Sequence, residues 1–220
     1  MDSQGSATAS LGYKEPDGMD ETISDVYRML INDDDFSPSF GIRKTSEKVD
    51  LMPGNIELAA VEVGLVNVMN RERILTDYIS MERPFYDFII IDCCPSLGML
   101  AINALSASDS VIIPVQPSYL PVKGLGQLFK TIYKVKKQIN PDLHIEGVLL
   151  NMVDARTNYA KEIINKIHEA YEGSIRIFDT YIPLSVKVGE ATAEGVSVLS
   201  HDPKGKAAMA YTKLTEEVLS

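Results

Sequence analysis

Residues 86–97 read YDFIIIDCCPSL, and this stretch decides the fold that the sequence predicts. The four consecutive apolar residues 88–91 are too few for a buried helix and indicate a strand covered on both faces, as in parallel sheets. Asp92 follows at the carboxyl end of this strand, where open α/β sheets place their ligands. Ser96 can cap the helix that comes next. A carboxylate at this place suits a magnesium ion, although α/β folds without that function also have a buried strand followed by aspartate.

Strand-like and helix-like stretches alternate along the chain and predict an α/β fold with a doubly wound, mainly parallel sheet. We expect one domain over residues 1–220. Residues 1–18 are rich in Gly and Ser and indicate a loop, and Asp20 is a possible cap for the first helix. The expected strands are 48–52, 88–91, 110–115, 145–153 and 175–178, and the expected helices are 21–30, 56–70, 71–81, 96–106, 122–138, 157–171 and 204–219.

The composition is that of an ordinary globular protein, with 45% hydrophobic and 24% charged residues. No apolar run approaches the roughly 18 residues of a membrane span. The first residues also lack the basic-then-apolar pattern of a signal peptide, so we expect a cytoplasmic protein. The two cysteines, Cys93 and Cys94, are neighbours in sequence and indicate reduced, inert thiols. The three histidines are scattered without metal-ligand spacing.

Charge is unevenly placed along the chain. Residues 1–120 hold 8 Lys and Arg against 19 Asp and Glu, whereas residues 121–220 hold 13 against 12. This balance argues against a strongly basic nucleic-acid binder, yet a local basic patch can bind where the average charge does not. Within the helix expected at 122–138 the lysines form one stripe and the apolar residues the opposite stripe, which fits either a solvated face or a binding patch. The lysines of the stripe are Lys123, Lys130, Lys134 and Lys137.

Four segments carry a resemblance to one known family. DCCPSLGMLAINAL, which begins at Asp92, resembles the Walker B segment of the ParA/Soj partition ATPases, relatives of MinD, where the run is commonly DCPPSLG. MDSQGSATASLG at 1–12 resembles the family's DPQGNAT stretch, and IPLSVKVGEA at 182–191 resembles its IPRNVRLSEA. IIPVQPSYLPVKGLGQL at 112–128 is a fourth match. One departure is Cys94, which stands where the family usually has proline.

The family's phosphate-binding loop is not found in this sequence. Such ATPases use a glycine-rich loop with lysine and Ser/Thr, KGGVGKT in this family, to bind the phosphates and magnesium. No GKT or GKS occurs among the 220 residues. In the family this loop precedes the DPQ stretch, so we expect the chain to lack the first strand, the loop and the first helix of the fold. The alternative is a natural family member that has lost its ATPase.

A missing strand would leave unpaired backbone groups inside the sheet. We therefore expect either that neighbouring strands close the gap or that another chain covers it.

The resemblance assigns roles around the nucleotide. Asp92 falls on the residue that holds the magnesium shell, through water. Asp2 and Gln4 match the catalytic aspartate and glutamine of the DPQ stretch, although a turn residue at a strand end is an equally good reading of Asp2. Pro183 and Ser185 fall on positions that line the adenine site, where Ser185 replaces the family's asparagine.

Asn151 is a candidate second adenine contact because an amide can both donate and accept, and a plain turn asparagine is the alternative. Lys187 falls where the family has an arginine associated with nonspecific DNA contact, and Lys204 and Lys206 could join the same surface.

The resemblance thus implies an ATPase of chromosome or plasmid partitioning. It implies ATP or ADP with Mg²⁺ as cofactors, a homodimer, nonspecific DNA and a ParB-like centromere-binding protein as partners, no membrane, and a cytoplasmic or nucleoid-associated location. The chain as it stands is expected to hydrolyse no appreciable ATP. The alternative function is a non-hydrolysing interaction module that binds a partner protein or DNA without nucleotide.

Overall fold

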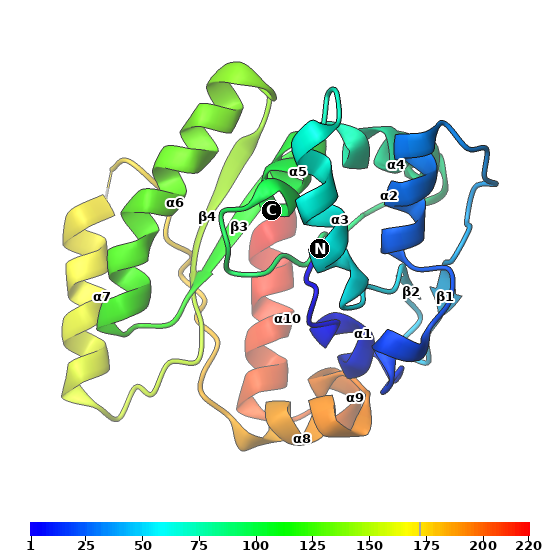
Figure 1. Cartoon of the computed structure of the whole chain (residues 1–220). Helices are drawn as coiled ribbons and strands as arrows, with labels where there is room; N and C mark the ends of the chain where they lie inside the picture. The colour runs from blue at the N-terminus through cyan, green and yellow to red at the C-terminus, as the bar shows by residue number, and fades with distance from the viewer. Residues whose placement is uncertain (172) are drawn as a thin grey trace.

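Two parallel strands stand at the centre of the computed structural model (Figure 1), which describes residues 1–171 and 173–220, with the backbone alone for 119–122. Strand β3 (Ser110–Val115) pairs with β4 (His144–Leu150), and a bulge interrupts their register between Val111 and Ile112. Two further parallel bridges extend the sheet, from Val148 to Ile177 and from Val153 to Pro183. The mainly parallel sheet is therefore confirmed, although the strand expected at 175–178 forms only one of these bridges.

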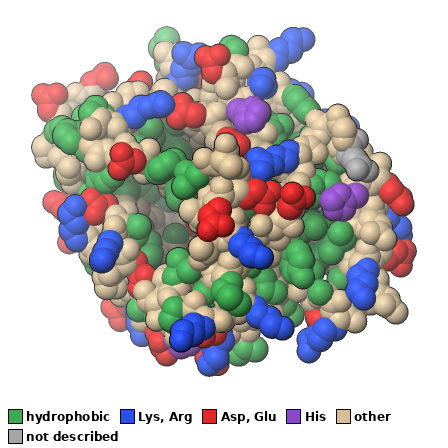
Figure 2. Space-filling model, turned by 180° about the vertical axis from the view of Figure 1, so that it is seen from behind, with side chains coloured by type: hydrophobic (Ala, Val, Ile, Leu, Met, Phe, Trp, Pro, Cys, Tyr) green, Lys and Arg blue, Asp and Glu red, His purple; other side chains and the backbone are tan. Residues whose placement is uncertain are grey.

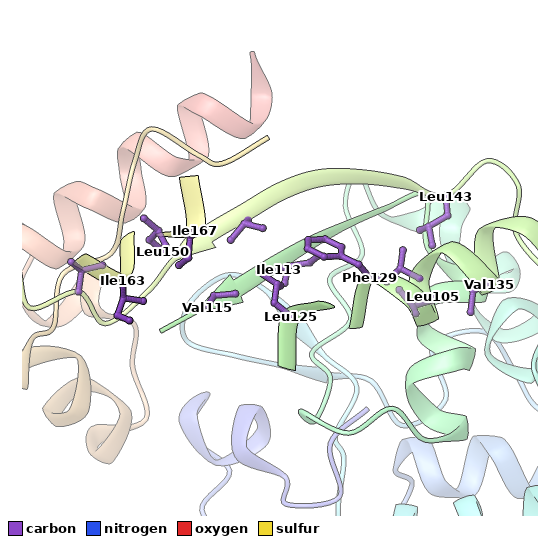
Figure 3. Close-up of a cluster of buried hydrophobic side chains, with 13 residues drawn as sticks. Leu105, Ile113, Val115, Leu125, Phe129, Val135, Leu143, Leu150, Ile163 and Ile167 are labelled. Carbon is purple, nitrogen blue, oxygen red and sulfur yellow. The ribbon is translucent and has the colours of Figure 1, made fainter. Parts of the chain in front are cut away.

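Helices cover both faces of this sheet, as the doubly wound fold requires. Because side chains of a strand alternate between faces, Val148 and Leu150 pack against α6 (Tyr119–Gln138) and α7 (Asn158–Tyr171), as Figure 3 shows for this cluster. Leu149 faces the other way and packs with α10 (Lys206–Leu219).

Helix α6 shows the two stripes that its sequence predicts. Leu125, Phe129, Ile132 and Val135 are buried against β3 and β4. The ring of Phe129 lies 5.3 Å from that of Tyr171 on α7, which ties the two helices together. The lysines of α6 therefore face away from the core.

The N-terminal half forms a second hydrophobic cluster, with Tyr27, Leu58 and Leu65 fully buried. Helix α5 (Met99–Ala107) joins the two cores, since Leu100 belongs to the second cluster and Leu105 to the first. The other elements of this half are α1 (Ser6–Ser10), η1 (Pro16–Gly18), α2 (Ile23–Asn32), β1 (Arg43–Lys44), β2 (Asp50–Leu51), α3 (Glu57–Gly64), η2 (Leu65–Asn67), α4 (Ile74–Glu82) and η3 (Arg83–Phe85).

The strand predicted at residues 88–91 is wrong for this structure. Phe88 is 72% exposed and Ile90 is 92% exposed, and no backbone partner lies opposite residues 87–91 in the part of the chain that the structure describes. Only one side of the segment is covered, because Ile91 packs against the second cluster. A strand buried on both faces needs neighbouring strands and a helix layer on each side, and here these are not supplied. Within the described residues β3 pairs only with β4, so no neighbouring strand pairs with residues 88–91.

Several boundaries also differ from expectation. Helix α2 begins after Thr22 rather than Asp20, because Thr22 and Asp25 form a capping box. Helix α5 begins after Gly98, and the hydroxyl of Ser96 lies 3.0 Å from the thiol of Cys94 instead of capping the helix. Among the described residues three α-helices were not predicted: α1, which lies in the expected loop, α8 (Val186–Glu194) and α9 (Val198–His201). Over the described residues, no helix has the length and apolar character needed to cross a membrane.

Candidate functional site

A cavity of about 760 Å³ lies beside the exposed segment 88–91. Residues 48–52 and 85–92 form two of its walls, and residues of the N-terminal loop and α1 form a third. Its lining is mainly apolar, with Asp2 and Asp92 among the lining residues. Figure 2 shows the molecule from behind, with a hollow lined by hydrophobic side chains on the side that carries the N-terminal elements.

The N-terminal loop brings Asp2 close to the chain around Asp92. The amino group of Met1 donates to the carbonyl oxygen of Asp92 at 2.6 Å. Oδ1 of Asp2 accepts from the backbone N–H of Gln4 at 3.0 Å, and the carbonyl of Asp2 accepts from Gly5 at 3.1 Å, so the carboxylate is held in a tight turn. Gly5 has a φ of 61°, and a Cβ there would approach the Gly54 carbonyl to 2.9 Å. The predicted catalytic residues Asp2 and Gln4 are thus adjacent, and Gln4 is exposed.

Asp92 is exposed at the cavity wall rather than buried among apolar neighbours. Magnesium commonly binds proteins through one or two carboxylates together with water and nucleotide oxygens, so a single accessible carboxylate fits this ion. Among the described residues no group of three or more His, Cys, Asp and Glu could hold a metal by itself.

The residues predicted for the adenine site lie on two paired segments. The N–H of Val153 donates to the carbonyl of Ile182 at 3.0 Å, and that of Leu184 donates to Val153 at 3.0 Å. This pairing places Asn151, at the end of β4, next to the segment that holds Pro183 and Ser185. Oδ1 of Asn151 accepts from the N–H of Met152 at 2.9 Å. Ser185 is the residue before α8, and its side chain makes no capping hydrogen bond.

Helices α1 and α8 contact each other where each of them ends. A Cβ on Gly195 would lie 2.7 Å from the Cα of Gly12, so only glycine permits this approach. Thr8 on α1 exchanges two hydrogen bonds with Gly54, at 3.1 and 3.0 Å. The Thr8 contact was not predicted, and no sequence signal pointed to it.

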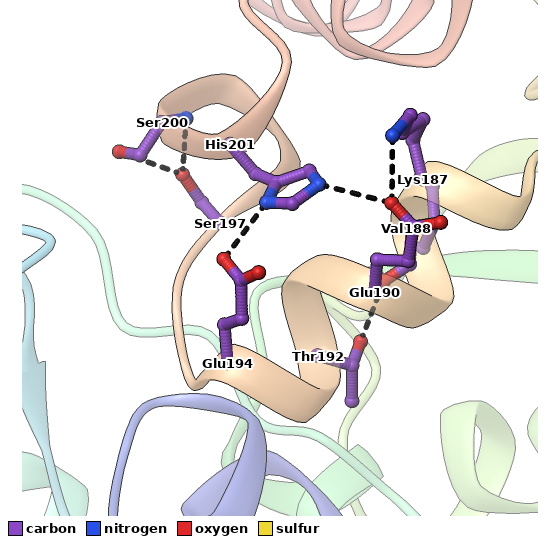
Figure 4. A network of polar contacts seen from close by, with 8 residues as sticks. All are labelled: Lys187, Val188, Glu190, Thr192, Glu194, Ser197, Ser200 and His201. Atoms are coloured by element: carbon purple, nitrogen blue, oxygen red, sulfur yellow. Dashed lines mark hydrogen bonds and ion pairs between the residues drawn. The ribbon is translucent and has the colours of Figure 1, made fainter.

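The predicted DNA-contacting lysines lie at the corner between α8 and α10. Nζ of Lys187 forms an ion pair with Glu190 at 2.7 Å, whereas Lys204 and Lys206 are exposed. His201 on α9 contacts Glu194 at 2.9 Å and Glu190 at 3.3 Å, as Figure 4 shows. The sequence gives no signal for this network of charged residues, because its members are ordinary surface residue types.

Protonation of His201 is expected to stabilise this corner. The hydrogen bonds to Glu194 and Glu190 raise the pKa of His201 above its ordinary value of about 6.5. A raised pKa in the folded state means that the stabilisation is complete below about pH 6.5 and is lost as the pH rises through the raised value. We expect hydrogen exchange in residues 186–201, corrected for its intrinsic rate, to show greater protection at about pH 6 than at about pH 8. His201→Gln should abolish this difference, and greater protection at the higher pH would contradict the prediction.

The cysteines beside Asp92 are not fully buried, since Cys93 is exposed and Cys94 is half-buried. Desolvation, with the neighbouring charges of Asp92 and Asp2, raises the pKa of Cys93 to about 11, so its thiol stays protonated near neutral pH. Its sulfur lies 3.6 Å from the carbonyl oxygen of Ile91.

Comparisons with known proteins agree with the fold and the order of these segments. Residues 1–145 match the family described as AAA domain. The chain is 41% identical to the sporulation initiation inhibitor protein Soj of Bacillus subtilis over 99% of its own length and 83% of that protein's length. It is 37% identical to the chromosome partitioning protein ParA of Myxococcus xanthus over 100% of the chain and 75% of that protein.

Among solved structures, cobyrinic acid a,c-diamide synthase from Mycobacterium smegmatis superposes with a TM-score of 0.83 at 32% identity, over 99% of this chain and 79% of that one. Another structure of that protein contains bound ADP and magnesium. The fold is thus that of the P-loop nucleotide hydrolases. Within this class, the chain belongs to the ParA/Soj family of chromosome-partitioning proteins.

Proposed function

We propose that this chain is the larger part of a partition ATPase, which in its complete form binds ATP and Mg²⁺, dimerises, and binds DNA nonspecifically while it acts with a ParB-like partner. In this proposal Asp92 serves the magnesium ion, and Asp2 and Gln4 orient the attacking water. Asn151, Pro183 and Ser185 line the adenine site, and Lys187, Lys204 and Lys206 contribute to DNA contact. The single observation that carries the proposal is Asp92, an accessible carboxylate on the cavity wall beside the loop of Asp2.

The surroundings of residues 88–91 support a site that this chain does not complete alone. The unpaired backbone groups of residues 88–91 could be satisfied by a neighbouring strand. The exposed side chains of Phe88 and Ile90 could be buried by a covering apolar layer. A unit with one strand and one helix would meet both needs, and such units have roughly 30 residues or more. We propose that this unit carries the phosphate-binding loop, because the sequence itself offers no lysine and Ser/Thr in the required loop.

The first consequence is that the 220 residues alone should bind ATP poorly. The phosphate cradle provides the contacts to the most highly charged part of the nucleotide. Calorimetry with ATP and Mg²⁺ is expected to show no saturable binding, and tight binding would contradict this prediction.

The proposal is tested by adding a phosphate-binding unit before the first residue of this chain. The chain preceded by a strand, a KGGVGKT loop and a helix of the family's kind should bind ATP saturably in the same calorimetric experiment. A change of the loop lysine to alanine in that protein is the control and should remove the binding. Absence of binding in the completed protein would favour the non-hydrolysing interaction module instead. Translation of the DNA upstream of the first codon provides an independent check.

A further inference from the structure

The outer face of α6 is a continuous basic surface, which we call the α6 lysine face. It consists of Lys123, Lys130, Lys134 and Lys137, all exposed. At 1.5 Å per residue these lysines extend over roughly 21 Å of helix. Helix α6 contains no Asp or Glu in its 20 residues, within a protein of net charge −10. Among the described residues, none of these four lysines forms an ion pair.

Three other lysines of the protein are neutralised by ion pairs. Lys44 pairs with Asp50 at 2.6 Å, Lys166 on α7 with Glu162 at 2.7 Å, and Lys187 with Glu190 at 2.7 Å. The α6 lysine face therefore differs from these sites in carrying charge that no carboxylate offsets.

The acidic part of the protein lies away from this face. Figure 1 places α6 and α7 at one side of the molecule and the N-terminal elements α2, β1 and β2 at the other. Residues 1–120 carry the excess of acidic groups. Charges further apart than about 8 Å are largely screened at physiological ionic strength. An anionic partner at α6 would therefore be attracted by the local lysines and only weakly repelled by the distant acidic half.

The side chains around the lysines favour nucleic acid over an acidic protein. Protein interfaces depend on apolar or aromatic anchors that become buried at their centre. On this face the large apolar residues of α6 point into the core, and Tyr133, which is 50% exposed, is the one aromatic ring beside the lysines on the described part of the helix. Contacts to phosphates instead use Lys, Tyr and Gln side chains, and Gln127 and Gln138 flank the stripe.

We propose that the α6 lysine face binds the phosphate backbone of double-stranded DNA without sequence preference. This inference rests on the proposed function in so far as both involve DNA, but it requires neither nucleotide nor the phosphate-binding unit. It adds a DNA-contacting surface on a helix separate from the one that carries Lys187.

The test measures binding of the 220-residue chain to a fluorescein-labelled random-sequence duplex of about 30 base pairs by fluorescence anisotropy at several salt concentrations, without ATP. The variant Lys130→Gln/Lys134→Gln/Lys137→Gln should bind at least about ten-fold more weakly at low salt, and the plot of log K against log salt should be flatter by about 2.7, or 0.9 for each lost phosphate contact.

The matched control is Lys14→Gln/Lys161→Gln/Lys213→Gln, which removes three exposed lysines and the same total charge. It should keep the salt slope of the unchanged protein. The exposed position of all six lysines means that both variants should fold, which circular dichroism verifies.

Three results would overturn the proposal. The first is that the α6 variant and the control lose affinity equally. The second is that Lys187→Gln/Lys204→Gln/Lys206→Gln removes the whole salt dependence while the α6 variant removes none. The third is that poly-glutamate of matched charge binds through the α6 lysines more tightly than the duplex, which would assign the face to an acidic protein. Failure here would leave the nucleotide proposal intact, because no ATP is involved.

Discussion

Asp92→Asn is expected to lower ATP hydrolysis at least about 100-fold in the protein completed with a phosphate-binding unit, since loss of one preorganised electrostatic group commonly costs a factor of this order. The substitution keeps the size of the side chain and removes its charge. A neutral amide is a poor magnesium ligand, so the bound ion would no longer be held beside the phosphates. Hydrolysis is measured by phosphate release under saturating ATP and Mg²⁺, and binding of ATP without Mg²⁺ is expected to change little.

The control for this prediction is Asp142→Asn. Asp142 is exposed in the connection before β4, and its substitution removes the same charge as Asp92→Asn. Asp142→Asn should leave hydrolysis unchanged. Asp2→Asn separates the two proposed roles, since it should impair hydrolysis while the magnesium dependence of nucleotide binding remains. If Asp92→Asn hydrolyses ATP at the rate of the unchanged protein, the carboxylate is not a part of the magnesium site.

The parts of the fold that the sequence predicts well are those whose neighbours lie within the described chain. Strand 110–115 was predicted with its observed bounds, and helices 122–138 and 157–171 were predicted to within three residues at their first ends. Their apolar periodicity is strong, and each packs against the other elements of the same core. Local pattern and tertiary packing agree there, so the pattern alone is sufficient.

Residues 88–91 were mispredicted for a related reason. Four apolar residues indicate a buried strand, but burial is a property of the surroundings, and the sequence of one segment cannot say whether neighbouring strands are present. The same stretch still indicated Asp92 as a candidate residue, and Asp92 lines the cavity. That choice depends only on the carboxylate following an apolar run in the sequence. The helices α8 and α9 were not predicted because they are short and contain few apolar residues. Their position depends on the contact of Gly12 with Gly195 and on the hydrogen bonds of His201, which join segments distant in sequence.

Asn103→Ala is expected to lower the free energy of unfolding by about 3 kcal/mol. A loss of this size is typical when buried hydrogen-bonding groups lose their partner. Asn103 lies on α5 and is fully buried. Its Oδ1 accepts from the N–H of Leu75 at 3.2 Å, and its Nδ2 donates to the carbonyl of Arg71 at 2.8 Å. The N–H of Leu75 lies in the first turn of α4, where a helix has N–H groups without internal partners, and Arg71 lies three residues before this helix. Alanine would leave these two groups unsatisfied and open a small cavity between α4 and α5.

Urea denaturation followed by circular dichroism measures this effect as a lower midpoint, by at least about 1 M for the m-values typical of urea. The control is Asn165→Ala on α7, an exposed asparagine within a helix, where alanine has the higher helix propensity and the midpoint should stay the same or rise slightly. Because α5 contributes Leu100 to the N-terminal cluster and Leu105 to the sheet core, loss of its attachment to α4 should weaken both clusters in a single transition. Two separate transitions in Asn103→Ala would show instead that the clusters unfold independently, and an unchanged midpoint would show that water replaces the amide without cost.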